Sequence, residues 1–210
     1  MGVKERRERE RVETRDKILD AARELFITKG YDGVSMRQVA DRIEYSATAI
    51  YEYFDDKEAL FHELCQEDFA RLAAVFQSRS MAADPIQRLK QIGQTYIDFG
   101  LNYPNHYKLM FMTPLPNPEL DERDREIKGN PEVDAYAFLK HTVEQAIGAG
   151  AFRPEFQDAE LVSQTLWASV HGVISLEIAK HCDPWVQWRP IAKRAQAMLD
   201  AVLRGMLKEN

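Results

Sequence analysis

The residues whose types and spacing could support chemistry lie in one short segment, SATAIYEYF, at positions 46–54. The first four of these residues are small, so a helix that begins here has a narrow amino end. Such a helix end fits the major groove of duplex DNA, which is roughly 12 Å wide. There Thr48 could hydrogen-bond a base edge, and Ala47 and Thr48 could contact a thymine methyl group. The chemistry that this pattern favours is the non-covalent recognition of DNA bases.

The same segment carries groups that suit DNA phosphates. The free N–H groups and the positive dipole end of the helix, with Ser46 as the expected cap, attract anions. Ile50 and Phe54 share one side of the helix and are expected to face a core. Tyr51 and Tyr53 then lie at the two edges of that side, where a ring can be buried while its hydroxyl meets a phosphate oxygen. Short helices with alanines also occur in other helical proteins, so ordinary packing remains the alternative.

Two flanking elements must position this segment, and the sequence predicts both. Residues 35–43 and 47–53 read as two short helices separated by Glu44-Tyr45-Ser46, which is the spacing of a helix-turn-helix. A helix predicted over 15–29 by its apolar periodicity supplies the third wall of their core.

Capping residues mark helix boundaries along the whole chain. Gly30 ends the first helix in the left-handed conformation, and Ser35 begins the second with a capping box to Gln38. Asp55 is the expected cap of the fourth helix. A capping residue also precedes a proline at Asp84-Pro85, Asn130-Pro131 and Asp183-Pro184. Long helices are expected over 131–149, 158–181 and 189–208.

The predicted fold class is therefore all-α, with about nine helices. An N-terminal three-helix helix-turn-helix domain is expected over 1–60 and a C-terminal helical bundle over 61–210. Residues 113–129 are expected to form a loop with a brief helical turn. The charged residues 1–14 are predicted to be a flexible arm. Two interpretations stay open for its KERRERERVETR sequence: a basic arm that follows DNA, or a solvated helix extension with pairs such as Glu5–Arg9.

Composition bounds the class of protein. With 45% apolar and 30% charged residues, the chain reads as globular rather than disordered, and no apolar run is long enough for a membrane span. Cys65 and Cys182 are expected to be free thiols in a reducing compartment, which predicts a cytoplasmic location. The net charge is −6, and residues 1–60 hold 12 Lys and Arg against 14 Asp and Glu, which weakly opposes nucleic-acid binding.

No catalytic or metal-binding pattern competes with DNA recognition. The five histidines are scattered, and the chain contains no HExxH, GxSxG or P-loop motif. We therefore expect no catalytic residue, no metal and no cofactor. A small helical enzyme that uses His171 and a nearby carboxylate remains an alternative.

Residues 15–60 resemble the N-terminal domain of the tetracycline-repressor (TetR) family of bacterial transcription regulators. The resemblance rests on ILDAARELFITKGYDGVSMRQVADRI, followed by S-x-x-x-I-Y-E-Y-F-D-D-K-E-A-L. It implies a homodimer, a palindromic double-stranded DNA operator and a C-terminal pocket for a small molecule. By position, the resemblance implies DNA contacts from Arg15, Ser35, Arg37, Ser46, Ala47, Thr48, Tyr51, Tyr53 and Lys57.

The turn between the two short helices departs from the family pattern. The family usually has Ala-Gly-Val-Ser where this chain has Ile43-Glu44-Tyr45-Ser46. Glu44 must adopt the left-handed turn at a cost of about 1 kcal/mol or reshape it. Glu52 adds a negative charge near the DNA-facing side, where it could accept from a cytosine amino group or simply be solvated.

The C-terminal two-thirds carry a weaker resemblance to one TetR subclass. Trp167, His171 and Gly172 resemble its Trp-x-x-x-His-Gly signature, and residues 103–111 resemble a second segment. Gly172 is expected to permit a close helix approach. A pocket for a small apolar or aromatic ligand is predicted, with ordinary core packing as the alternative for each residue. Its predicted lining is Tyr96, Phe99, Tyr103, Met110, Phe111, Phe138, Trp167 and His171.

These expectations combine into one functional hypothesis: a DNA-binding transcriptional regulator, most simply a repressor that a small molecule releases from its operator. The helices at 158–181 and 189–208 are expected to form the two-fold dimer interface. The main alternative is an all-α ligand-binding or scaffolding protein that has lost DNA binding, which the acidic balance, Glu44 and Glu52 suggest.

Overall fold

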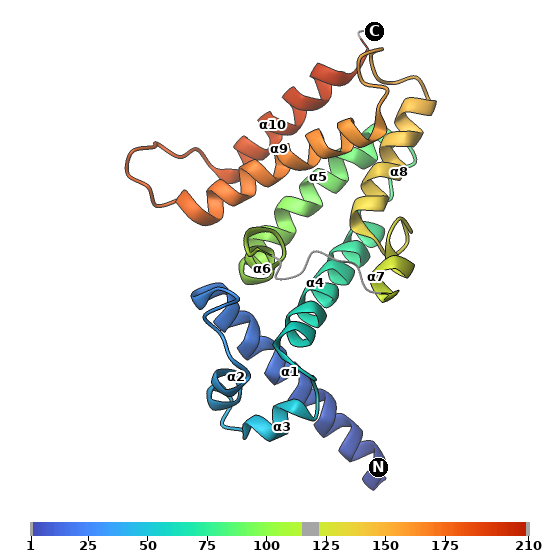
Figure 1. Ribbon diagram of the computed structural model, residues 1–210. Helices are drawn as coiled ribbons and strands as arrows, with labels where there is room; N and C mark the ends of the chain where they lie inside the picture. The colour runs from blue at the N-terminus through green and yellow to red at the C-terminus, as the bar shows by residue number, and fades with distance from the viewer. Residues whose placement is uncertain (1, 115–121, 209–210) are drawn as a thin grey trace. The chain divides into compact units, whose positions relative to one another are not determined.

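The all-α fold class is confirmed by a computed structural model, which describes residues 2–114 and 122–208 (Figure 1). Within those ranges there are ten helices and, apart from one isolated bridge between Phe152 and Leu207, no β-structure. The helices are α1 (Val3–Lys29), α2 (Met36–Arg42), α3 (Ala47–Tyr51), α4 (Lys57–Arg79), α5 (Pro85–Asn102), α6 (Pro104–Met112), α7 (Glu122–Ile127), α8 (Ala135–Gly148), α9 (Ala159–Lys180) and α10 (Ile191–Met206). None of the described helices is long and apolar enough to cross a membrane.

Several predicted caps are confirmed atom by atom. Gly30 has φ 72°, and its N–H donates to the Phe26 carbonyl at 2.9 Å. The N–H of Gln38 donates to Ser35 Oγ at 3.3 Å, and the N–H of Ser35 donates to Gln38 Oε1 at 3.0 Å. Ser46 Oγ accepts from the N–H of Ala49 at 3.2 Å. Local side-chain chemistry thus sets the ends of α1, α2 and α3.

Two capping predictions are wrong because the same side chains also close turns. Asn130 Oδ1 accepts from the N–H of Glu132 at 3.0 Å, and α8 begins only after Asp134, whose Oδ1 accepts from Tyr136 N–H at 2.8 Å. Asp183 Oδ1 likewise accepts from the N–H of Trp185 at 3.0 Å in a turn. An Asx residue before proline suits a helix start or an Asx-turn, and local sequence does not separate the two.

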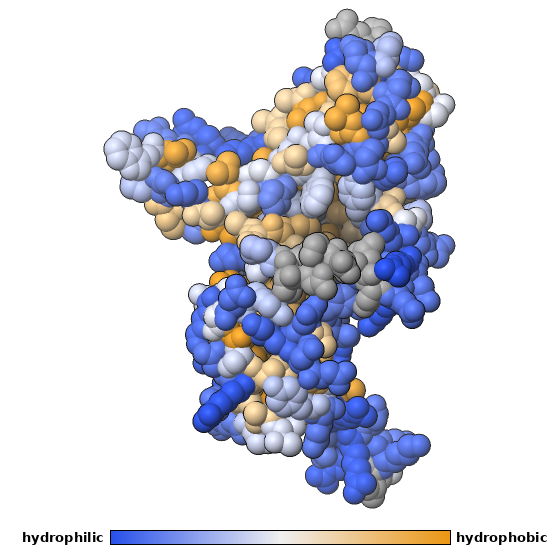
Figure 2. All heavy atoms as spheres, in the orientation of Figure 1, coloured by the Kyte–Doolittle hydropathy of each residue, from blue (hydrophilic) through white to orange (hydrophobic). Residues whose placement is uncertain are grey.

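The first helix is longer than the sequence predicted. It begins at Val3, so residues 3–14 are a helical extension rather than a separate arm, and Figure 2 shows this end of the chain as almost wholly hydrophilic. The predicted Glu5–Arg9 pair does not form among the described residues. Instead Glu5 Oε2 accepts from the N–H of Gly2 at 2.9 Å, and Arg6 pairs with Glu10 at 2.7 Å.

The predicted loop over 113–129 holds one short helix, α7, which matches the expected helical turn. Its residues 115–121 lie outside the described part of the chain.

The chain divides into two compact units. The first contains the described residues up to Asp68 and those from Asn105 to Pro114. It therefore adds α6 and the start of α4 to the three predicted helices, whereas the predicted functional boundary at residue 60 stays a prediction. The core of this unit consists chiefly of Ile18, Ala22, Phe26, Val39, Ala40, Ile50, Leu60, Phe61, Leu64 and Leu109.

The second unit contains Phe69–Pro104 and the described residues from Glu122 onward. In it α5 packs against α8, α9 and α10, and α9 packs against α8 and α10. A Cβ at Gly93 would lie 2.5 Å from Leu199 Cδ2, so glycine permits the close approach of α5 to α10. At Gly172, for which we predicted that role, no described atom lies within 4 Å of the Cβ position, and that prediction is wrong within this chain.

We expect Leu109→Ala to lower the free energy of unfolding by about 2–5 kcal/mol, because Leu109 is fully buried in the core of the first unit. Urea denaturation followed by circular dichroism measures the change. Met112→Ala on the same helix is the matched control, since Met112 is exposed. Equal losses from the two substitutions would show that α6 is not part of that core.

Candidate functional site

The turn between α2 and α3 adopts a strained backbone conformation at Glu44. Glu44 has φ 61°, and it is the only described residue other than glycine with a positive φ. The N–H of the next residue, Tyr45, donates to the Ala40 carbonyl at 3.0 Å, which closes the turn. Of the two alternatives that the sequence left open, Glu44 adopts the left-handed region rather than reshaping the turn, so the two short helices keep helix-turn-helix spacing despite the missing glycine.

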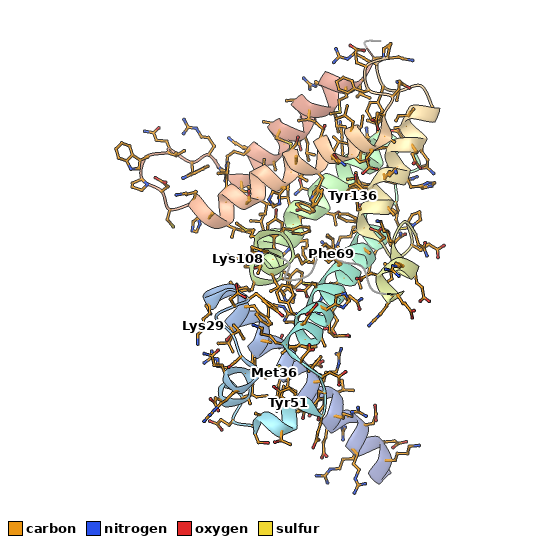
Figure 3. All side chains as sticks on the ribbon, viewed as in Figure 1. Lys29, Met36, Tyr51, Phe69, Lys108 and Tyr136 are labelled. Atoms are coloured by element: carbon orange, nitrogen blue, oxygen red, sulfur yellow. The ribbon has the colours of Figure 1, made fainter. Side chains whose placement is uncertain are left out.

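Helix α3 buries one side and leaves its tip open. Ile50 is fully buried and Phe54 is 6% exposed, whereas Thr48 is exposed and the Tyr51 side chain is 52% exposed. Figure 3 labels Tyr51 on this helix and the buried Met36 on α2. Because the apolar side chains face inward, the small polar tip is left available for an outside partner.

The remaining predicted contacts of this segment lie around that tip. Ser46 is exposed, while Ala47 and Tyr53 are partly buried against the core of the first unit. Ser35 and Arg37 are exposed at the amino end of α2. The first unit thus holds these five residues on α2, α3 and their flanks.

Lys57, the predicted phosphate contact, is held in place by Tyr31. Its Nζ donates to the Tyr31 carbonyl at 3.0 Å and lies 4.1 Å from the centre of the Tyr31 ring. Burial, with the nearby charge of Glu58, raises the pKa of the Tyr31 hydroxyl. The helix cap here is Asp56, whose Oδ1 accepts from Ala59 N–H at 2.8 Å, so the prediction of Asp55 is off by one residue. Lys57 therefore stands at a fixed position at the start of α4.

Arg15 has partners inside the protein. Its guanidinium donates to Glu63 Oε1 and to Glu67 Oε1, both at 2.6 Å, and lies 5.8 Å from the Phe54 ring centre. These contacts join α1 to α4. A DNA contact from Arg15 stays a prediction. In such a contact, a phosphate would compete with Glu63 and Glu67 for the Arg15 guanidinium.

A buried charged cluster that the sequence reading missed joins α1, α4 and α6. Arg23 and Asp68 are 6% and 1% exposed, and the Arg23 guanidinium meets the two Asp68 oxygens at 3.1 and 3.3 Å. His106 Nδ1 lies 2.6 Å from Asp68 Oδ1. A buried bidentate pair fixes orientation as well as charge. The available signal was Arg23 itself, a charged residue within the apolar stripe of α1.

The predicted ligand residues are divided between the two units. Met110 and Phe111 belong to the first unit, and the other six belong to the second. In the second unit, the Trp167 indole N–H donates to Tyr96 Oη at 3.1 Å, and Tyr96 Oη lies 3.3 Å from His171 Nδ1. Tyr96 is buried, while Trp167 and His171 are partly accessible. These three residues of α5 and α9 therefore form one hydrogen-bonded group.

The other ligand residues of the second unit lie in aromatic pairs. The ring centres of Phe99 and Tyr103 are 5.4 Å apart, and those of Phe138 and Phe76 are 6.2 Å apart. Such pairs are equally consistent with core packing and with a pocket wall.

Tyr136 of α8, which the sequence reading did not select, extends this aromatic group. Its ring centre lies 5.9 Å from that of Trp167, and its hydroxyl donates to Glu160 Oε1 at 2.5 Å. Burial and that hydrogen bond raise the pKa of Tyr136 to about 12. Hydrogen bonds from Tyr136, Lys140 and Gln164 lower the pKa of Glu160 to about 2. The signal was the position of Tyr136 near Phe138 on the apolar stripe of α8.

Two family models match this chain. One, described as bacterial regulatory proteins of the tetR family, matches residues 18–64, and the other, described as a tetracyclin repressor-like C-terminal domain, matches residues 89–202. The HTH-type transcriptional repressor AcnR of Corynebacterium diphtheriae is 43% identical over 61 residues, which are 29% of this chain and 32% of that protein. The HTH-type transcriptional activator FasR of Mycolicibacterium smegmatis is 31% identical over 102 residues, 48% of this chain and 47% of that protein.

The fold is similar to solved structures over nearly its whole length. A putative tetR family transcription regulator from Shewanella sp. PV-4 has a TM-score of 0.72 at 17% identity, covering 93% of this chain and 98% of that one. The matches to the AcnR proteins and to FasR are shorter: the chain spans about a third to just under half of the length of these curated relatives.

We expect Glu44→Gly to raise the free energy of unfolding by about 0.5–1 kcal/mol. Glycine removes the steric strain that a Cβ causes at φ 61°. Glycine also loses more conformational entropy on folding, and this loss offsets part of the gain. Glu44→Ala is the control, since it removes the same charge but keeps the Cβ. Urea midpoints that rise equally for both variants would assign the gain to charge rather than to the backbone.

Burial lowers the pKa of His171, so the unfolded chain binds its proton more readily than the folded chain. The protein is therefore expected to lose stability as the pH falls through the ordinary histidine range, about 6.5. His171→Gln should reduce this acid-side loss, and urea midpoints at neutral and mildly acidic pH measure it. An equal reduction by His141→Gln, at an exposed histidine, would contradict the assignment.

Proposed function

Since the chain belongs to the tetR family of bacterial regulatory proteins, we propose that it is a sequence-specific DNA-binding transcriptional regulator. The observation that carries the proposal is the outward tip of α3, where Thr48 and Tyr51 are exposed while Ile50 lies in the core. A narrow helix end fixed from behind can enter a major groove without rearrangement.

The proposed division of labour places base contacts at the tip and phosphate contacts around it. Ala47 and Thr48 would read base edges and thymine methyl groups, and Ser46 would stand at the helix end that favours a phosphate. The phosphate contacts would come from Arg15, Ser35, Arg37, Tyr51, Tyr53 and Lys57. Phosphate contacts fix the register, whereas base contacts supply the specificity.

We further propose a homodimer on a palindromic double-stranded operator, with half-sites one helical turn or a multiple of it apart. The support is the solvent-facing side of α9, where Leu161 and Leu176 are about half exposed and Gly172 has open space above it. Helices α9 and α10 pack side by side, as the predicted two-fold interface needs. No described atom lies within 4 Å of the Cβ position of this glycine, and a partner helix would supply that neighbour.

The proposed regulation is release of a repressor by a small apolar or aromatic molecule bound in the C-terminal domain, which we assign to residues 61–210. The hydrogen-bonded group of Tyr96, Trp167 and His171 supports a site with apolar walls and few polar groups. For a near-complete switch, the ligand must bind the conformation that does not bind DNA more tightly than the DNA-binding conformation, by about 5.5 kcal/mol. Among the relatives, AcnR is named a repressor and FasR an activator. Repression, rather than activation, is therefore part of our proposal. Membership of the Trp-His-Gly subclass and a cytoplasmic location are also proposed.

The main alternative is an all-α ligand-binding or scaffolding protein whose N-terminal domain no longer binds DNA. It is favoured by the exposed carboxylates of Glu44 and Glu52, next to the proposed reading helix. A small helical enzyme that uses His171 is the other alternative. Sequence-selective, salt-dependent binding of duplex DNA separates the proposed regulator from both.

We expect Tyr51→Phe to weaken DNA binding about tenfold, equivalent to about 1.4 kcal/mol, because it removes only a hydroxyl that donates to phosphate. Fluorescence anisotropy on duplexes enriched by the wild-type protein from a random library measures it. Tyr103→Phe is the matched control, at an exposed tyrosine of the second unit. The proposal fails if the wild-type protein enriches no sequence, and the role of Tyr51 fails if the two variants behave alike.

A further inference from the structure

In the amino-terminal extension of α1, charged side chains of different sign lie on different sides of the helix. Residues 4–13 are exposed, and they continue α1 by several turns beyond Ile18, where its buried core residues begin. In the sequence the charges alternate in sign. On a helix, residues three or four positions apart share a side, so the alternation in sequence is not an alternation in space.

Three cations fall on one side of this extension: Lys4, Arg7 and Arg11, at spacings of three and four. The next positions on the same side are Arg15, which pairs with two glutamates of α4 and lies over the Phe54 ring, and then Ile18 and Ala22, both fully buried in the core of the first unit. The basic face, as we call Lys4, Arg7 and Arg11, is therefore on the side of α1 that faces the core shared with α2, α3 and α4. Of the acidic residues, Glu8 flanks this face, and Glu5, Glu10 and Glu13 point to other sides.

The charge of the basic face is not neutralised inside the protein. Within the described residues, the side chains of Lys4, Arg7 and Arg11 form no ion pair or hydrogen bond. By contrast, Arg15 is paired with two glutamates and Arg23 with Asp68. The cations nearest the core thus hold the unit together, whereas those beyond it remain available to an outside anion.

The extension is also a rigid carrier for these charges. It is continuous with the core-anchored part of α1, so it needs no separate nucleation, and the Arg6–Glu10 pair supports it from another side. In Figure 1, α1 continues past α3 toward the amino terminus, and Figure 2 shows that part as hydrophilic. Ordering costs on binding are therefore smaller than for a flexible arm.

We propose that the basic face binds the phosphate backbone of DNA that flanks the half-site read by α3. This inference rests on the proposed function and deepens it by adding three contacts outside the helix-turn-helix. Lys4 and Arg11 are separated by about 10 Å along the helix, a length over which one DNA strand carries about three phosphates. The partner is thus a regular row of anions beside the α3 tip, which is the chemistry of a duplex backbone.

The test compares two triple variants with the same change in net charge. One replaces the basic face, Lys4→Gln, Arg7→Gln and Arg11→Gln. The control replaces cations on the other sides of the same helix, Arg6→Gln, Arg9→Gln and Lys17→Gln. Circular dichroism checks that both keep their helix content. Binding is measured by anisotropy over a series of salt concentrations, on a duplex that the wild-type protein has enriched from a random library.

The basic-face variant is expected to lower the slope of log affinity against log salt by about 2.7, or about 0.9 for each lost phosphate contact. The control variant should keep a slope close to that of the wild-type protein. Shortening the duplex to the edge of the α3 half-site should weaken the wild-type protein and the control but leave the basic-face variant unchanged.

Equal slope losses in the two variants, or no dependence on duplex length, would overturn the inference while leaving the proposed function intact. A wild-type protein that enriches no duplex would overturn both. If the basic-face variant alone loses helix content, the three substitutions are tested one at a time. Each should lower the slope of log affinity against log salt by about 0.9.

Discussion

Helix α3 has only five residues, too few to hold a helical form in water, and its shape depends on the burial of Ile50 and Phe54. That burial determines which side chains face outward. Because Ile50 is fixed in the core of the first unit, Thr48 is held on the opposite side and Tyr51 at the edge, and both are exposed. The proposed DNA-reading surface thus results from apolar packing, which α1, α2, α4 and α6 all supply.

The net charge of residues 1–60 does not describe the surface that DNA would meet. The Glu24–Arg42 pair, at 2.8 Å, joins α1 to α2 and removes a cation together with a carboxylate, so it leaves the sum unchanged. Glu63 and Glu67, which lie beyond residue 60, pair with Arg15 and join α1 to α4. The remaining charge is distributed by side, as at the start of α1. A net charge is a sum over all surfaces, whereas an anion meets only one of them.

In the second unit, hydrogen bonds join three of the predicted ligand residues. Trp167 and His171 lie one turn apart on α9, and both reach Tyr96 of α5. The packing of α5 on α9 places their polar atoms. On α5, Gly93 also permits a close approach of α10. Polar groups held in this way can orient a ligand, because their own positions are already determined by the fold.

The sequence by itself determined what depends on near neighbours. The caps at Gly30, Ser35 and Ser46 and the inward Ile50 all follow from spacings of a few residues. Tertiary structure alone decided the partners of charged groups: Arg23 and Asp68 are 45 positions apart, and Asp68 and His106 are 38 apart. It also decided that Asn130 and Asp183 close turns. Periodicity and capping are local properties, but a distant partner is brought into reach only when helices pack, and no pattern in the chain records that distance.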